Sequence, residues 1–139
     1  MVQVIEDAIG KKQGISLAQP LWRAEQIRKM EQCWAEREGQ ALYALMERAG
    51  AALCNYARHH WPQSHHWWIF VGPGNNGGDG YVLARLARRL GLEPLVIAAR
   101  APGLLRGDAR RAADEWLALG GEVMMADALE VASLPSPDL

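Results

Sequence analysis

Five glycines fall within the nine residues from Gly72 to Gly80, and this segment constrains the fold more strongly than any other feature of the chain. It follows a solid apolar run, residues 67–71, and leads into a helical pattern. A strand, a glycine-rich turn and a helix in this order form a phosphate cradle, because bare backbone N–H groups and the positive end of the helix dipole face the same ligand. The sequence therefore predicts a ligand site at the start of this helix.

Polar side chains inside the turn distinguish it from a generic phosphate cradle. Asn75 and Asn76 are followed by the carboxylate of Asp79. A carboxylate beside bound phosphate is unfavourable unless a cation or a substrate group offsets it. Simpler roles remain open: Asp79 could cap a helix that begins at Gly80 or Tyr81, and the two asparagines could be ordinary turn residues.

Composition limits the class of protein. With 139 residues and 50% hydrophobic content, the chain makes one domain with a modest core. The net charge of −1 gives no electrostatic case for nucleic acid or an anionic membrane as a partner. No apolar run approaches the roughly 18 residues that span a bilayer, and the N-terminus lacks a secretory h-region. Cys33 and Cys54 are expected to be free thiols in a reducing cytoplasm.

Two helices are expected before the glycine-rich loop. Residues 1–19 lack periodicity, and we expect a flexible leader there. A first helix follows Pro20 and is broken by Gly39, with Ile27, Met30 and Trp34 on one face. A second helix is predicted over residues 40–60. Its expected apolar side comprises Leu42, Leu45, Ala49, Ala52, Leu53 and Tyr56.

The pattern then changes to alternating strands and helices. Residues 67–71 and 95–99 are continuous apolar runs, which is typical of strands covered on both faces, and residues 122–125 are a short third strand. The helix after the loop stops at Gly91, and we expect it to turn Arg85, Arg88 and Arg89 outward. A third helix contains Ala109, Ala112, Ala113, Trp116 and Leu117 and ends at Gly120. Right-handed crossovers give a parallel sheet in the order 3-2-1.

The predicted fold class is α/β: a Rossmann-like βαβαβ parallel sheet preceded by two N-terminal helices. In such sheets the first strand is central. Residues 136–139 look like the start of another element, so we expect residues 20–139 to be the N-terminal part of a domain that ends before its fourth strand. The open edge of residues 67–71 would then need a cover. A second copy of the chain could supply it, so a homodimer is a candidate assembly.

The loop and its surroundings resemble the NAD(P)H-hydrate epimerase family. The likeness lies in residues 74–80, which read Gly-Asn-Asn-Gly-Gly-Asp-Gly, in residues 45–50 upstream, which read Leu-Met-Glu-Arg-Ala-Gly, and in Ala84-Arg85. It extends from Pro20 to the C-terminus. The resemblance implies a repair isomerase that interconverts the R and S epimers of hydrated NADH and NADPH. A nucleotide-dependent dehydratase, often the second domain of the same protein, accepts only the S form.

The resemblance also implies which residues act. Asn75, Asn76, Gly77, Gly78 and Asp79 are expected to contact the substrate, and Asn76 to give an oxygen ligand to a potassium ion. Hard cations prefer such oxygens. The remaining potassium ligands and the catalytic acid and base are expected beyond Leu139, so the 139-residue chain alone is expected to be inactive.

Two other functions remain open from the residues alone. Residues 72–77 satisfy G-x-G-x-x-G after a strand, as in a dinucleotide-binding dehydrogenase. However, Arg100 stands where the acidic ribose ligand is usual, and the dehydrogenase pattern leaves no role for Asp79. A non-catalytic binding or interaction module of the same fold is the other alternative. A P-loop is excluded, because no Gly-Lys-Ser/Thr follows the turn.

Overall fold

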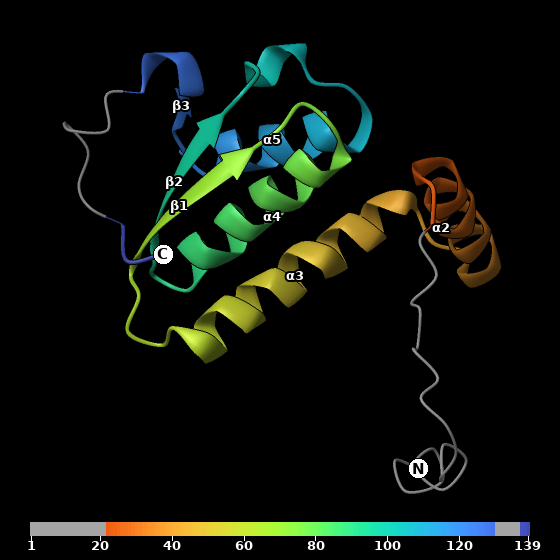
Figure 1. Cartoon of the computed structure of the whole chain (residues 1–139), viewed down its shortest axis with the longest axis horizontal. Helices are drawn as coiled ribbons and strands as arrows, with labels where there is room; N and C mark the ends of the chain where they lie inside the picture. Colours follow the sequence, from red (N-terminus) through yellow and green to blue (C-terminus); the bar gives the residue numbers. More distant parts are fainter. Residues whose placement is uncertain (1–21, 130–136) are drawn as a thin grey trace, which may run out of the picture.

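The computed structural model describes residues 22–129 and 137–139, so the expected leader, residues 1–19, lies outside the described residues. Helices and strands alternate after two initial helices (Figure 1). In order they are α2 (Ala24–Glu38), α3 (Leu42–His60), β1 (His66–Val71), α4 (Asn75–Arg89), β2 (Glu93–Ala98), the short helical turn η1 (Pro102–Leu104), α5 (Gly107–Ala118), β3 (Val123–Met125) and the turn η2 (Ala126–Ala128).

The three strands form one parallel sheet in the order β1-β2-β3. Trp68 lies opposite Leu95, and Ile97 lies opposite Met124. This order and direction confirm the predicted α/β class and the 3-2-1 arrangement. α4 and α5, which make the two crossovers, pack against each other beside the sheet (Figure 1).

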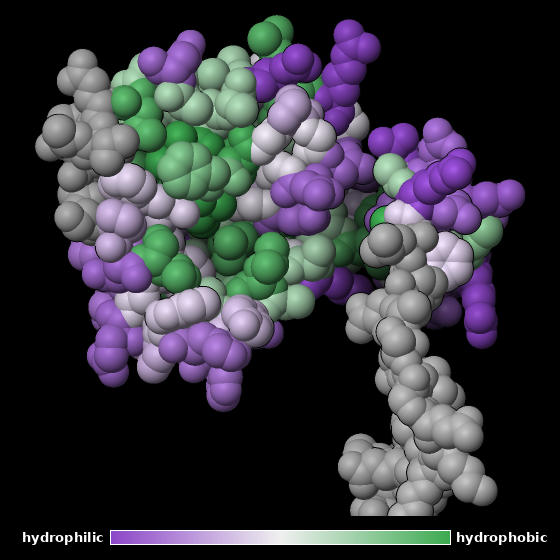
Figure 2. Space-filling view, viewed as in Figure 1, coloured by the Kyte–Doolittle hydropathy of each residue, from purple (hydrophilic) through white to green (hydrophobic). Residues whose placement is uncertain are grey.

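The expectation that β1 is covered on both faces is wrong for the described residues. Trp67, Ile69 and Val71 are buried, whereas Phe70 on the opposite face is 64% exposed. Successive side chains of a strand point to opposite faces, and both right-handed crossovers place their helices on the same side of the sheet. Hydrophobic residues accordingly gather on the face seen in Figure 2, while the surface of α2 is mainly hydrophilic.

The buried face of α3 also differs from the prediction. Leu53 and Tyr56, expected to be buried, are 48% and 57% exposed. The buried residues are Tyr43, Met46, Gly50, Cys54 and Ala57. α3 carries two apolar stripes. The stripe that includes Gly50 faces the core, because only a residue without a side chain fits against Val82 of α4. The exposed stripe is therefore not part of the core.

α2 contacts the remainder of the described chain only lightly. It ends at Gly39, whose φ of 60° is left-handed, as predicted from the glycine. The expected apolar face is largely uncovered, because Ile27 and Met30 are 43% and 45% exposed. Trp34 is the exception, since the guanidinium of Arg48 on α3 lies 5.2 Å from the centre of its ring.

Arg85 is buried rather than turned outward as expected, with only 9% of its surface exposed. Its guanidinium pairs with Glu47 on α3 and with Glu115 on α5. The two carboxylates lie 38 and 30 positions away in the sequence and so form no local pattern with Arg85. A helical wheel of α4 alone therefore places this arginine in solvent.

The last residues of the chain pair with the free edge of β1. The carbonyl of His66 accepts from the backbone N–H groups of Asp138 (2.8 Å) and Leu139 (3.2 Å), and Trp68 N–H donates to the carbonyl of Leu139 (2.7 Å). Alternating bonds of this kind place Leu139 beside β1 as in a parallel ladder. At this end β1 therefore has a backbone neighbour on each side, while the new element expected over residues 136–139 stays a prediction.

The side chain of Asp138 fixes this pairing. Its Oδ2 accepts from the backbone N–H groups of His65 (2.7 Å) and His66 (2.9 Å), and lies 3.2 Å from His66 Nδ1. The other ring nitrogen of His66 lies 3.2 Å from a carboxylate oxygen of Glu93 on β2. The hydrogen bonds from His66 and His65 lower the pKa of Asp138 from 3.8 to about 2.

Asp138→Asn should remove an acid-sensitive contribution to stability. Because the folded-state pKa of Asp138 is depressed, its contribution is present above the ordinary value of 3.8 and is lost as pH falls to about 2. We expect wild type to melt above Asp138→Asn at pH 6, and the gap to shrink below pH 4 and vanish near pH 2. Thermal unfolding from pH 7 to pH 2 tests this, with Asp127→Asn as the control. A gap independent of pH would contradict the assignment.

Candidate active-site cleft

Three helices present their N-terminal ends at the carboxyl edge of the sheet. α4 begins at Asn75, just after β1 ends at Val71, and the first turns of α3 and α5 line the same cleft. None of these three N-termini has a side-chain cap. Uncapped helix N-termini carry partial positive charge and unpaired backbone N–H groups. The fold therefore concentrates anion-binding character at the start of α4, next to the first turns of α3 and α5.

The cleft between these helices has a volume of about 110 Å³. It brings together three of the predicted residues, namely Asn75, Asn76 and Asp79. Its lining residues are Glu31, Leu42, Leu45, Met46, Ala49, Asn75, Asn76, Asp79 and Asp108. Glu31 and Asp108 are not among the residues predicted from the sequence. Asp108 follows Gly107 at the start of a helix and could have been noticed, but nothing in the sequence places Glu31 of α2 beside the loop.

Asp79 does not cap the helix, contrary to the simpler interpretation of the loop. α4 begins at Asn75 with Gly74 as its N-cap, so Asp79 is the fifth residue of the helix. The turn is shorter than the glycines suggested, because Gly77, Gly78 and Gly80 lie within the helix. Burial, and to a smaller extent the charge of Glu31, raise the pKa of Asp79 above its ordinary value.

The glycines inside α4 have a packing role. A β-carbon on Gly77 would overlap the carbonyl of Gly72, one on Gly78 would meet Met46 of α3, and one on Gly80 would meet Val71 of β1. Gly77 and Gly78 are themselves buried, whereas Asn75 and Asn76 are exposed. The glycines thus allow α4 to approach its neighbours closely, and the asparagines and Asp79 are left to face the cleft.

The donor chemistry of the cleft suits a hard cation next to a polar anion. Amide and carboxylate oxygens are the ligands that such cations prefer. Within residues 22–129 and 137–139, no three histidine, cysteine, aspartate or glutamate side chains lie close enough to hold a metal ion together.

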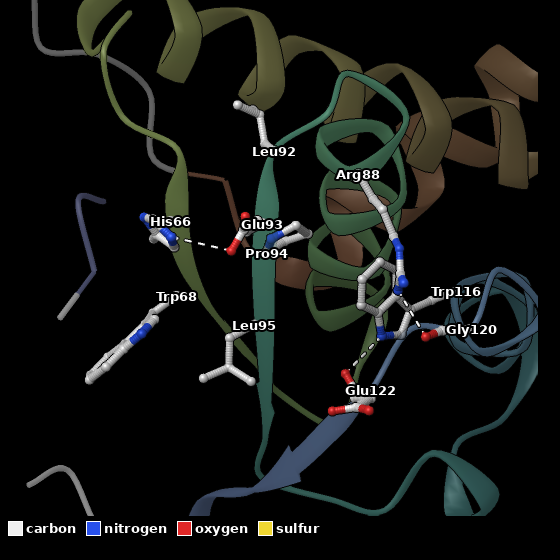
Figure 3. A pocket seen from close by; sticks show the side chains of 10 residues that line it. All are labelled: His66, Trp68, Arg88, Leu92, Glu93, Pro94, Leu95, Trp116, Gly120 and Glu122. Atoms are coloured by element: carbon white, nitrogen blue, oxygen red, sulfur yellow. Dashed lines mark hydrogen bonds and ion pairs between the residues drawn. The ribbon is translucent and has the colours of Figure 1, made fainter. Parts of the chain in front are cut away.

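A second hollow, of about 400 Å³, lies at the opposite end of the strands (Figure 3). It exists because β3 pairs only with Val96–Ala98 and leaves the first half of β2 unpaired on that side. Arg88 closes one wall by stacking over Trp116, 5.4 Å from the ring centre, and by donating to the carbonyl of Gly120 (2.9 Å). None of the predicted site residues lines this hollow.

Residues 42–136 match the family described as YjeF-related protein N-terminus. This match includes the two motifs beside the cleft, residues 45–50 of α3 and residues 74–80 at the start of α4. The chain belongs to this family. In the described part of the chain no helix is long and apolar enough to cross a membrane.

Curated relatives in the family agree with the resemblance found in the sequence. The bifunctional NAD(P)H-hydrate repair enzyme Nnr of Escherichia coli is 42% identical over 113 residues, which is 81% of this chain and 22% of the relative. The NAD(P)H-hydrate epimerase of Bordetella pertussis is 40% identical over 100 residues, 72% of this chain and 42% of the relative. The chain thus spans less than half the length of either relative.

A solved structure supports the fold. The crystal structure of yeast ynu0, YNL200c, superposes with a TM-score of 0.59 over 75% of this chain and 46% of the yeast chain. At 23% sequence identity, this likeness concerns the fold alone.

Gly77→Ala should destabilise the protein, because the added methyl group would overlap the backbone carbonyl of Gly72, which cannot move aside as a flexible side chain can. Overpacking of this kind costs about 1–3 kcal/mol in the free energy of unfolding. Gly74→Ala is the matched control, since a β-carbon there meets nothing within 4 Å. Urea denaturation of both variants measures the difference, and equal stability of the two would refute the packing role of Gly77.

Proposed function

We propose that this chain forms the substrate- and potassium-binding part of an NAD(P)H-hydrate epimerase, which interconverts the R and S forms of hydrated NADH and NADPH. The observation that carries the proposal is the cleft in which Asn75, Asn76 and Asp79 meet at three converging helix N-termini. The names of the relatives, a repair enzyme and an epimerase, support the same activity.

The residues of the cleft have separate tasks in this proposal. The exposed backbone at Asn75 and Asn76, with no side-chain cap, offers N–H groups to the phosphates of the dinucleotide. The side-chain oxygen of Asn76 is a ligand to potassium, which would supply positive charge near the phosphates. Asp79 is half-buried and faces the same space, where a low local dielectric strengthens its interaction with a cation or a substrate hydroxyl.

Gly77 and Gly78 contribute to this site by letting α4 pack closely, which aligns the first turn of the helix. We further propose a cytoplasmic protein, which the two free thiols of Cys33 and Cys54 suit. A homodimer is part of the proposal as well, since exposed side chains such as Phe70 and Tyr56 offer apolar surface to a second copy.

A dehydrogenase half-domain is less well supported. β2 ends at Ala98 and is followed by Ala99 and the exposed Arg100, so no carboxylate stands at the strand end to bind a ribose. The carboxylates of Glu31, Asp79 and Asp108 lie instead in the cleft beside the loop. A module that binds the ligand without catalysis would use the same cleft. Measuring the epimerisation rate distinguishes such a module from an enzyme.

Asp79→Asn should lower the rate of epimerisation at least tenfold in the protein as its gene encodes it, because even the loss of one preorganised hydrogen-bond donor from an active site can cost about 10²–10³ in rate. Chromatographic separation of the R and S hydrates, with potassium present, follows the reaction. Asp127→Asn, which changes a carboxylate outside the cleft, is the control. A rate close to wild type in Asp79→Asn would remove Asp79 from the site.

Asn76→Ala should raise the potassium concentration needed for half-maximal activity, since one oxygen ligand is lost while the glycines stay in place. The measurement is the epimerisation rate as a function of KCl concentration at constant ionic strength. Asn55→Ala, an exposed asparagine on α3 away from the cleft, is the control. An unchanged potassium dependence in Asn76→Ala would show that the cation binds elsewhere.

A further inference from the structure

Two sequence motifs that lie apart in the chain meet through an ion pair between Arg85, which is buried, and Glu47, whose side chain is 44% exposed. Glu47 belongs to residues 45–50, and Arg85 lies six residues after Asp79 on α4. Arg85 Nη2 donates to Oε1 of Glu47, and Arg85 Nη1 lies 3.2 Å from Oε2 of Glu115 on α5. The proposed chemistry uses neither residue directly, so the pairing of these motifs requires another explanation.

The ion pair extends into a network that joins three helices. Tyr43 of α3 donates its hydroxyl to Glu115 at 2.8 Å, and Arg111 of α5 binds the other oxygen of Glu115 at 3.0 Å. The guanidinium of Arg111 also lies 3.8 Å from the centre of the Tyr43 ring. Burial and Glu115 raise the pKa of Tyr43, so the phenol remains a neutral donor. α3, α4 and α5 are thus tied together by directional polar contacts.

The same segment of α3 also forms a wall of the cleft. Met46 packs against Gly78, and Gly50 packs against Val82, so this side of α3 holds α4. The neighbouring side chains Leu45 and Ala49 line the cleft. Because a helix is rigid over two turns, a displacement of Glu47 would also displace Leu45 and Ala49 relative to the loop.

Stability alone is a weak reason for this network. Burying an ion pair costs desolvation energy, and well-packed apolar residues often serve equally well. A guanidinium shared between two carboxylates provides fixed orientation, because its N–H groups are directional. The cost of burying Arg85 is therefore best explained by control of the position of α3.

We propose that Glu47 and Arg85 are positioning residues, which hold α3 against α4 and so set the width of the cleft around Asn75, Asn76 and Asp79. This inference rests on the proposed function for its activity readout. It also predicts a change in the local structure of the loop, which can be observed without any reaction.

The test compares Glu47→Gln, Arg85→Lys and Arg85→Met with wild type, in the protein as its gene encodes it. Glu47→Gln removes one charge with almost no change in shape, and Arg85→Lys keeps the charge but loses the forked geometry. Arg58→Gln is the matched control, because Arg58 is an exposed arginine on α3 that lines neither the cleft nor the hollow around Glu47 and makes no ion pair with any described residue. Each variant is measured below its melting temperature for kcat and KM with hydrated NADPH.

A second readout is the backbone amide NMR spectrum of residues 75–79. We expect Glu47→Gln and Arg85→Lys to shift these amides and to lower kcat/KM by an order of magnitude, since small misplacements in a site can cost about 10²-fold. The double variant Glu47→Gln/Arg85→Met should lose no more than Arg85→Met alone, because the two residues act as a unit. Arg58→Gln should leave both readouts unchanged.

The outcomes separate the two proposals. Lower melting temperatures with unchanged kcat/KM and unchanged amide positions in residues 75–79 would overturn the positioning role and leave a purely structural network. If wild type shows no epimerisation but the loop amides still respond to Glu47→Gln, the proposed function fails and the positioning inference stands.

Discussion

The close approach of α4 to β1 and α3 is the constraint on which the rest of the structure depends. It requires three glycines in the first turns of the helix, where side chains would collide with Gly72, Met46 and Val71. This approach brings the start of α4 to the end of β1 and lets α3 lie beside it. A cleft then forms at the N-terminal ends of the helices. At positions that the glycine contacts leave free, the α4 side chains that line it are those of Asn75, Asn76 and Asp79.

Packing and ligand binding therefore share one short segment but divide it residue by residue. Asn75 and Asn76 occupy the exposed side of the first turn, and Gly77 and Gly78 occupy the buried side. Asp79 lies at the boundary, half-buried against α3 and close enough to Glu31 to be affected by its charge. With 3.6 residues per turn, about two successive residues of a helix face solvent and the next two face the core. The two asparagines and the two glycines follow this alternation.

The sequence predicted the features that depend on local pattern. Apolar runs located all three strands, crossover chirality fixed their order, and the glycine-rich turn placed the cleft. Partners from distant segments could not be predicted. Arg85 is basic on a helix and was expected in solvent, but two distant carboxylates bury it. α3 has two apolar stripes, and the choice between them depends on the shape of α4, as the contact between Gly50 and Val82 shows.

The pairing of Leu139 with β1 also bears on how the domain folds. His66 and Glu93, which lie opposite each other in β1 and β2, are 27 residues apart, whereas the contact of His66 with Asp138 closes a loop of 72 positions. Loop-closure entropy rises with length, so pairing between β1 and β2 is entropically easier to form first. The edge of β1 that receives Asp138 and Leu139 would then be the last to be protected during folding. Until that step β1, an apolar strand, offers unpaired backbone groups to other chains. The order in which strands pair therefore affects aggregation as well as the folding rate.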